Sequence, residues 1–137
     1  MGAISVTAGQ TSLSLNDDTQ GYTILSSGEV WRSEKNFTPY LETRQGTILF
    51  SEAGSISASL WETGVGEGIR TTYRDFSIDG KEDSLAFETV AWIEFSTGDV
   101  FFEFIPLDEG NIDLVSIRWP GPMEFDEKSG KWYSVLN

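Results

Sequence analysis

The chain has 137 residues, contains neither cysteine nor histidine, and carries a formal net charge of −13 from 22 acidic and 9 basic side chains. The missing residue types exclude disulfides, thiol nucleophiles, imidazole general bases and the common zinc sites. The acidic balance excludes the basic footprint of a nucleic-acid-binding protein, and no apolar run approaches the ~18 residues of a membrane-spanning helix.

A chain of this length corresponds to one ordinary domain, so we expect residues 1–137 to form a single domain. We expect no cofactor, no metal site, and no nucleic-acid or membrane partner. The N-terminus lacks a secretory signal pattern, and with cysteine absent this favours a cytoplasmic location.

Short segments rich in β-branched and aromatic residues recur along the chain, separated by Gly, Asp, Asn and Ser. No segment keeps the i, i+3, i+4, i+7 apolar spacing of a full helix. This pattern predicts an all-β fold, a two-sheet antiparallel β-sandwich. The predicted strands cover residues 4–8, 12–16, 21–25, 30–33, 47–51, 55–62, 69–78, 85–96, 99–107, 112–119 and 131–136.

The clearest local prediction is a hairpin over residues 85–107 with Thr97 and Gly98 as its turn. This register pairs Phe95 with Val100, Ile93 with Phe102 and Ala91 with Phe104, which gives one wholly apolar face for the core. The opposite face carries Val90, Trp92, Glu94, Phe101, Glu103 and Ile105.

That second face is too apolar for a surface left in water. Either the hairpin lies in a central sheet covered on both sides, or Trp92, Phe101 and Ile105 form an interface with another domain or subunit. We favour the interface, because the final residues, WYSVLN at 132–137, read as a strand that is cut off. We therefore expect a fragment of a longer multidomain enzyme.

Three features could carry chemistry, and each has a structural alternative. Glu94 and Glu103 are diagonal neighbours in the predicted register, as a glycosidase carboxylate pair requires, with Glu88 further along the same face. The alternative is that they are solvated or interface glutamates of an acidic protein. We favour this alternative and assign no catalytic residue.

The second feature is a glycine-rich segment, which lacks the Lys-Ser/Thr of a phosphate-binding loop. We expect a loop that positions a substrate or a plain connector, whose glycines permit positive φ. It consists of Gly64, Val65, Gly66, Glu67 and Gly68.

The third feature is the tryptophan content, with Trp31 and Trp61 as candidates for stacking on sugars. The alternative is that these rings belong to the core, where aromatic side chains contribute the largest buried apolar area.

Several aromatic-rich segments in this order resemble the N-terminal β-sandwich of glycoside hydrolase family 31 enzymes, of the α-glucosidase and α-galactosidase type. They are residues 68–76 (GIRTTYRDF), 87–89 (FET), 92–94 (WIE), 104–107 (FIPL), 117–122 (IRWPGP) and 132–136 (WYSVL). The resemblance spans residues 28–136 and implies a sandwich of the galactose mutarotase-like, or supersandwich, type. The family's catalytic aspartates lie on a (β/α)₈ barrel, so no catalytic residue carries over.

The resemblance implies a non-catalytic accessory domain that packs on the catalytic barrel of the same parent chain. It also implies that one loop shapes the substrate entrance, for which residues 64–68 are the candidate. Two alternatives stay open: a free-standing carbohydrate-binding module, and a structural interaction domain without sugar affinity.

Overall fold

The computed structural model describes residues 4–16, 21–126 and 134–135. The described residues contain no α-helix, which confirms the all-β prediction. One 3₁₀ turn, η1 (Phe50–Glu52), interrupts the strands. The strands are β1 (Ile4–Ala8), β2 (Thr11–Leu15), β3 (Tyr22–Ser26), β4 (Glu29–Ser33), β5 (Tyr40–Thr43), β6 (Gly46–Leu49), β7 (Ser55–Thr63), β8 (Gly66–Arg74), β9 (Phe76–Ile78), β10 (Lys81–Asp83), β11 (Ala86–Glu94), β12 (Val100–Asp108), β13 (Leu114–Arg118), β14 (Met123–Asp126) and β15 (Ser134–Val135).

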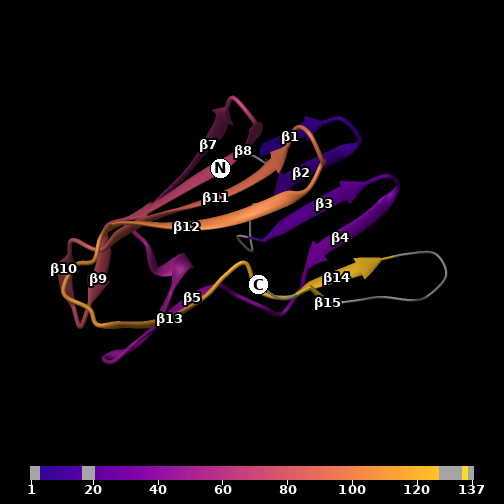
Figure 1. Cartoon of the computed structure of the whole chain (residues 1–137). Helices are drawn as coiled ribbons and strands as arrows, with labels where there is room; N and C mark the ends of the chain where they lie inside the picture. The colour runs from indigo at the N-terminus through magenta and orange to yellow at the C-terminus, as the bar shows by residue number, and fades with distance from the viewer. Residues whose placement is uncertain (1–3, 17–20, 127–133, 136–137) are drawn as a thin grey trace.

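The strands form antiparallel sheets in two layers, which confirms the predicted sandwich (Figure 1). One layer is a four-stranded sheet in the order β12-β11-β8-β7. Opposite it lie a six-stranded sheet, β1-β2-β3-β4-β14-β15, and a three-stranded sheet, β13-β5-β6. The short β9–β10 hairpin extends from one end of the molecule.

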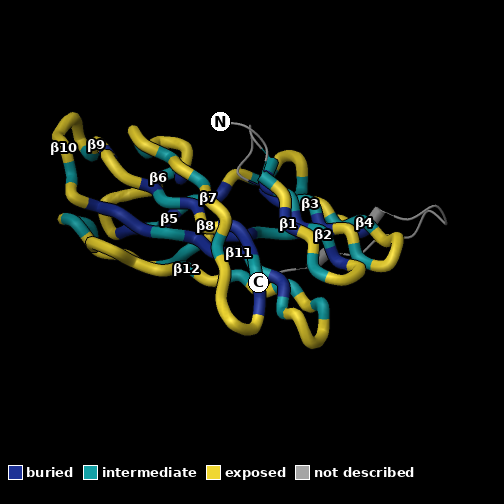
Figure 2. The backbone as a smooth tube through the Cα atoms, turned by 90° about the horizontal axis from the view of Figure 1, so that it is seen from above, coloured by how far each residue is buried: buried dark blue, intermediate teal, exposed yellow. Residues whose placement is uncertain are grey.

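The core follows from the period-2 alternation of the strands, which directs every second side chain to one face. In β2, Leu13 and Leu15 are buried, whereas Ser12 and Ser14 are only half-buried. The two leucines belong to one cluster of buried residues with Ile69 of β8 and Ile93 of β11. The deepest burial therefore runs along β8 and β11, while the edge strands β7 and β12 are largely exposed (Figure 2).

Phe50 joins the three-stranded sheet to this core. Its side chain is fully buried, and its ring centroid lies 5.1 Å from that of Tyr73 and 4.8 Å from that of Phe87. The 3₁₀ turn that carries Phe50 connects β6 to β7, so this ring lies where the chain passes from one layer to the other.

Two buried tyrosines give the core a polar centre. Burial raises the pKa of Tyr22 to about 12, an effect that the nearby Thr89, Thr71 and Trp119 side chains partly offset. Burial is also the main cause that raises the pKa of Tyr73, and the nearby Tyr22 raises it further. Both phenols therefore stay protonated well beyond the usual range of tyrosine.

The strand prediction missed β5, β10 and β14, which are only three or four residues long and therefore too short to show a clear alternation. The predicted strand over residues 69–78 is two strands, because Asp75 adopts a φ of 60° between β8 and β9. Of the predicted strand over residues 131–136, only β15 lies within the described residues.

The hairpin of β11 and β12 forms with a different register. Ile93 pairs with Val100, Ala91 with Phe102 and Thr89 with Phe104, a shift of two residues from the prediction. The turn is wider because Glu94 N–H bonds to the carbonyl of Asp99 at 2.9 Å, and Gly98 N–H bonds to the carbonyl of Glu94 at 2.8 Å.

A shift of two residues leaves every side chain on its predicted face. The prediction was wrong for Phe95, which lies in the turn and is 55% exposed instead of in the core.

Candidate functional site

The outer face of the four-stranded sheet carries a row of aromatic side chains. The ladders place Trp61 opposite Gly68, Gly68 opposite Trp92, and Trp92 opposite Phe101. The Trp92 and Phe101 rings stack with centroids 5.1 Å apart, and the Trp61 and Trp92 rings lie 5.7 Å apart at an angle of 54°. The rings thus pack on one another across four strands.

The structure corrects the expectation for the glycine-rich segment. Only Gly64 and Val65 connect the strands, as a two-residue turn, while Gly66, Glu67 and Gly68 belong to β8. None of the three glycines is among the residues with positive φ.

Space, and not backbone conformation, explains two of these glycines. A Cβ atom on Gly66 would overlap the six-membered ring of Trp92, and one on Gly68 would overlap the backbone of Ala91 and Trp92. A Cβ on Gly64 meets nothing within 4 Å. Gly66 therefore leaves room for the Trp92 indole, and Gly68 allows the close approach of the β11 backbone.

Polar side chains surround the aromatic row. The Trp92 indole Nε1–H donates to Glu103 Oε2 at 2.6 Å, which fixes the orientation of the ring. Four residues from Trp92 in β11, Glu88 Oε2 accepts from Thr72 Oγ1 at 3.3 Å and lies 4.0 Å from Arg70 Nε. The face combines oriented aromatic rings with paired charges.

This face stays partly open. Trp92, Phe101 and Ile105, predicted as an interdomain face, lie together on it, and Phe101 and Ile105 are 42% and 37% exposed. Between them Val90 is fully buried. The described part of the chain therefore does not cover the face, although the side chains on it are closely packed.

The register separates the two glutamates considered as a catalytic pair. Glu103 lies opposite Val90, and Glu94 is four residues further along β11. At ~3.4 Å per residue this is a separation of about 14 Å along the strand, beyond the roughly 5–10 Å that glycosidase carboxylates require. The predicted diagonal placement is wrong because it depended on the tighter turn.

Trp31 lies elsewhere, on β4 of the six-stranded sheet, so it shares no surface row with Trp61. Its ring packs on Phe125 with centroids 4.6 Å apart. It also lines a small pocket of about 230 Å³ with residues that include Thr11 and Val100.

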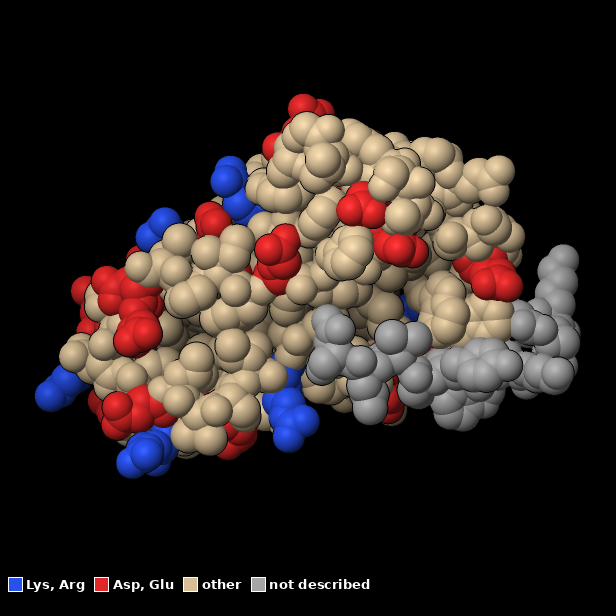
Figure 3. Space-filling view, in the orientation of Figure 1, with Lys and Arg blue, Asp and Glu red and all other residues tan. Residues whose placement is uncertain are grey.

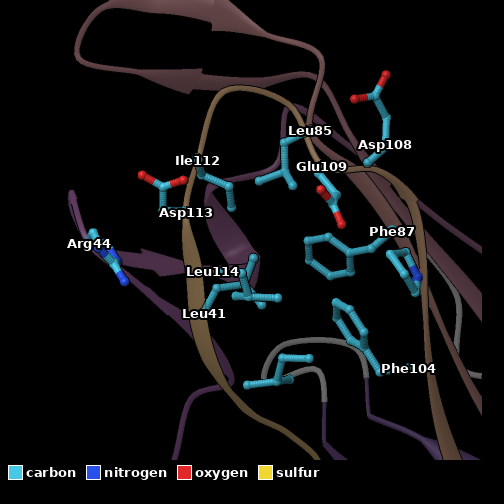
Figure 4. A pocket seen from close by; sticks show the side chains of 13 residues that line it. Leu41, Arg44, Leu85, Phe87, Phe104, Asp108, Glu109, Ile112, Asp113 and Leu114 are labelled. Atoms are coloured by element: carbon cyan, nitrogen blue, oxygen red, sulfur yellow. The ribbon is translucent and has the colours of Figure 1, made fainter.

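A larger pocket, of about 710 Å³, opens between the layers where the chain crosses from β12 to β13 (Figure 4). Its lining is mostly apolar, and its mouth carries charged side chains. The apolar residues are Leu41, Leu85, Ala86, Phe87, Phe104, Pro106, Ile112, Leu114 and Ile117, and the charged ones are Arg44, Asp108, Glu109 and Asp113. Sequence reasoning missed this pocket.

Charged side chains are spread over the surface, and both signs gather at the end that carries β9 and β10 (Figure 3). In the described residues, no three acidic side chains are grouped to hold a metal ion. Over the same residues, no helix has the length and apolar character to cross a membrane.

Solved structures of alpha-N-acetylgalactosaminidase NagBb from Bifidobacterium bifidum resemble this chain. The complex with Gal-NHAc-DNJ aligns at a TM-score of 0.78 and 30% identity, covering 88% of this chain and 19% of that chain. The GalNAc complex gives 0.77 and 32%, over 90% of this chain and 19% of that chain. The ligand-free form gives 0.72 and 32%, over 88% and 18%.

No protein-family model and no curated protein matches the sequence. The chain spans about a fifth of the length of the solved proteins that it resembles. The similar fold and the sequence identity together relate this chain to a domain-sized part of a glycoside hydrolase.

Proposed function

We propose that this chain is the non-catalytic N-terminal accessory domain of a family 31-like α-glycosidase, and that residues 1–137 fold as one unit. The alignment carries the proposal: nearly the whole chain matches a small part of a large glycosidase at about 30% identity. The family 31 assignment has its support in the aromatic-rich segments of the sequence.

The outer face of the four-stranded sheet is the surface that we propose packs on the catalytic barrel. Trp92, Phe101 and Ile105 give it an apolar centre, with Glu103 and Arg70 beside them. Interfaces are enriched in aromatic residues and arginine at such centres. The adjoining Gly64–Val65 turn would then lie near the substrate entrance.

The experiment compares the isolated chain with the protein encoded by its complete reading frame. We expect the isolated chain to hydrolyse none of the nitrophenyl α-glucoside, α-galactoside and α-N-acetylgalactosaminide, and the complete protein to hydrolyse one. Turnover by the isolated chain, or a complete reading frame that encodes no barrel, would refute the proposal.

Substitutions test the interface. Phe101→Asp and Ile105→Asp should leave the isolated chain folded, because both side chains are already more than one-third exposed. In the complete protein they should lower the melting temperature and the activity. Leu25→Asp is the matched control, since Leu25 is 43% exposed but lies on the six-stranded sheet. Equal effects of all three substitutions would contradict the assigned face.

Titration with mono- and oligosaccharides, followed by tryptophan fluorescence, tests the binding-module alternative. A flat response is expected because Trp61 and Trp92 pack against each other at 54° and do not present coplanar rings. Saturable quenching that Trp61→Ala abolishes would favour a carbohydrate-binding module instead.

A further inference from the structure

The pocket between the layers lies on the opposite side of the four-stranded sheet from the proposed barrel interface. Phe87 and Phe104 form part of its lining, with ring centroids 5.0 Å apart at 29°. They occupy positions of the opposite parity to Trp92 and Phe101 in the same two strands, so they point to the inner face.

Polar and apolar groups are segregated in this pocket. An entering group would contact Leu114, which is 46% exposed, while Leu41, Leu85 and Phe87 are each at most 4% exposed. None of these side chains offers a ligand a hydrogen bond. A bound sugar would bury hydroxyl groups there without partners, at a substantial cost. The chemistry of the depth fits an aromatic or branched aliphatic group.

The mouth has a negative balance, with three carboxylates against one guanidinium. Glu109 points toward Phe87, whereas Asp108 points away from the pocket (Figure 4). No hydrogen bond or ion pair of the described residues engages Glu109, so its carboxylate is available to a cation.

Hydrogen bonds from two hairpins, β9–β10 and β5–β6, reach the segment between β12 and β13 at the mouth. Asp83 Oδ1 accepts from the Asn111 backbone N–H and side-chain amide, both at 3.2 Å. Gln45 and Asp113 exchange two hydrogen bonds of 3.1 and 3.2 Å.

Gly110 is required for this crossing. It adopts a φ of +61°, and a Cβ atom there would overlap the Asp83 carboxylate. The pocket is therefore a fixed feature of the crossing from β12 to β13.

We propose that this pocket binds a peptide segment from outside residues 1–137, which inserts an apolar side chain flanked by lysine or arginine. An apolar anchor in a deep pocket with charges at its rim is the usual arrangement of an interface hot spot. Charge complementarity selects a basic segment. This step rests on the proposed function: a parent glycosidase as long as the solved neighbours, of which the match covers 19%, would have ample chain to supply such a segment.

The test uses three acetylated, amidated tripeptides, Lys-Phe-Lys, Glu-Phe-Glu and Lys-Ser-Lys, titrated into the chain and followed by NMR. We expect Lys-Phe-Lys to shift the methyl signals of Leu41, Leu85 and Ile117 with a dissociation constant that rises with salt. Glu-Phe-Glu and Lys-Ser-Lys should each bind at least tenfold more weakly. Equal binding of all three, or shifts confined to other surfaces, would overturn the proposal.

Variants of the exposed mouth avoid unfolding the chain. Glu109→Gln should weaken Lys-Phe-Lys binding about threefold, and Glu109→Lys should reverse the preference toward Glu-Phe-Glu. Glu29→Gln, an exposed acid on the six-stranded sheet, should change nothing. Unchanged affinity in Glu109→Lys would also refute the proposal. These outcomes do not depend on a parent glycosidase, because they concern the isolated chain alone.

Discussion

Gly68 and Trp92 lie directly opposite each other in the β8–β11 ladder, and a Cβ atom on Gly68 would overlap the Cα and Cβ atoms of Trp92. The indole crosses toward β12, where its N–H donates to Glu103. The ring itself covers Gly66, the neighbouring glycine of β8. An aromatic ring over a cross-strand glycine compensates for the packing that glycine lacks. The Trp92 side chain is thus positioned by glycines of β8 and by a hydrogen bond to β12. Substitutions can test these two contacts separately.

Gly68→Ala should destabilise the protein by about 1–3 kcal/mol, as overpacking of a close contact does. The added Cβ would overlap backbone atoms of Ala91 and Trp92, which cannot move aside without distorting the ladder. Urea denaturation followed by tryptophan fluorescence measures the change. Gly64→Ala is the control, because open space surrounds Gly64 and its φ is not positive. Equal losses for both would mean that flexibility, not space, requires these glycines.

The hydrogen bond between Trp92 and Glu103 should contribute measurably despite its exposure. Because Glu103 is exposed, we expect a coupling free energy of about 0.5–1 kcal/mol, below the range for buried charged hydrogen bonds. A double-mutant cycle of Trp92→Phe and Glu103→Ala isolates this energy from the two separate side-chain effects, because each substitution removes one partner of the hydrogen bond. A coupling near zero would show that stacking on Phe101 alone orients the indole.

The sequence predicted which face each side chain of the β11–β12 hairpin occupies, because strand alternation depends only on parity. It did not predict the register, since turn length is set by hydrogen bonds such as that from Gly98 to Glu94, which composition does not reveal. The misplacement of Phe95 and the apparent closeness of Glu94 to Glu103 both followed from that single error.

Two parts of the candidate sites could not be predicted at all. The need for glycine at position 66 depends on the indole of Trp92, 26 positions away in the sequence. The pocket combines Leu41 with Phe87 and Ile112, from three distant segments. Periodicity assigns residues to faces, but it does not show where two layers separate.

Raising the pH should destabilise the fold through Tyr22. Its pKa is near 10 when unfolded and about 12 when folded, so between these values the unfolded chain loses the proton first. The contribution of Tyr22 to the free energy of unfolding is therefore fully present below pH 10. It falls by up to about 2–3 kcal/mol as the pH approaches 12. Tyr73 shifts in the same direction. Urea denaturation at pH 8 to 11.5 measures the slope.

Tyr22→Phe should make that alkaline slope shallower, whatever its effect on stability at pH 8. Tyr40→Phe serves as the matched control, because Tyr40 is only half-buried, on β5. An unchanged slope in Tyr22→Phe would show that the alkaline loss of stability arises elsewhere.

Phe50 should couple the three-stranded sheet to the rest of the molecule. Its ring packs on Tyr73, Phe87 and Phe104, so Phe50→Ala should cost about 3–5 kcal/mol, whereas Leu60→Ala, at a site 61% exposed, should cost little. If all 137 residues fold as one unit, calorimetry of the unaltered chain shows one transition. Phe50→Ala then lowers the midpoint temperature of that single transition. Two transitions, of which only one responds to Phe50→Ala, would mean that the layers unfold separately.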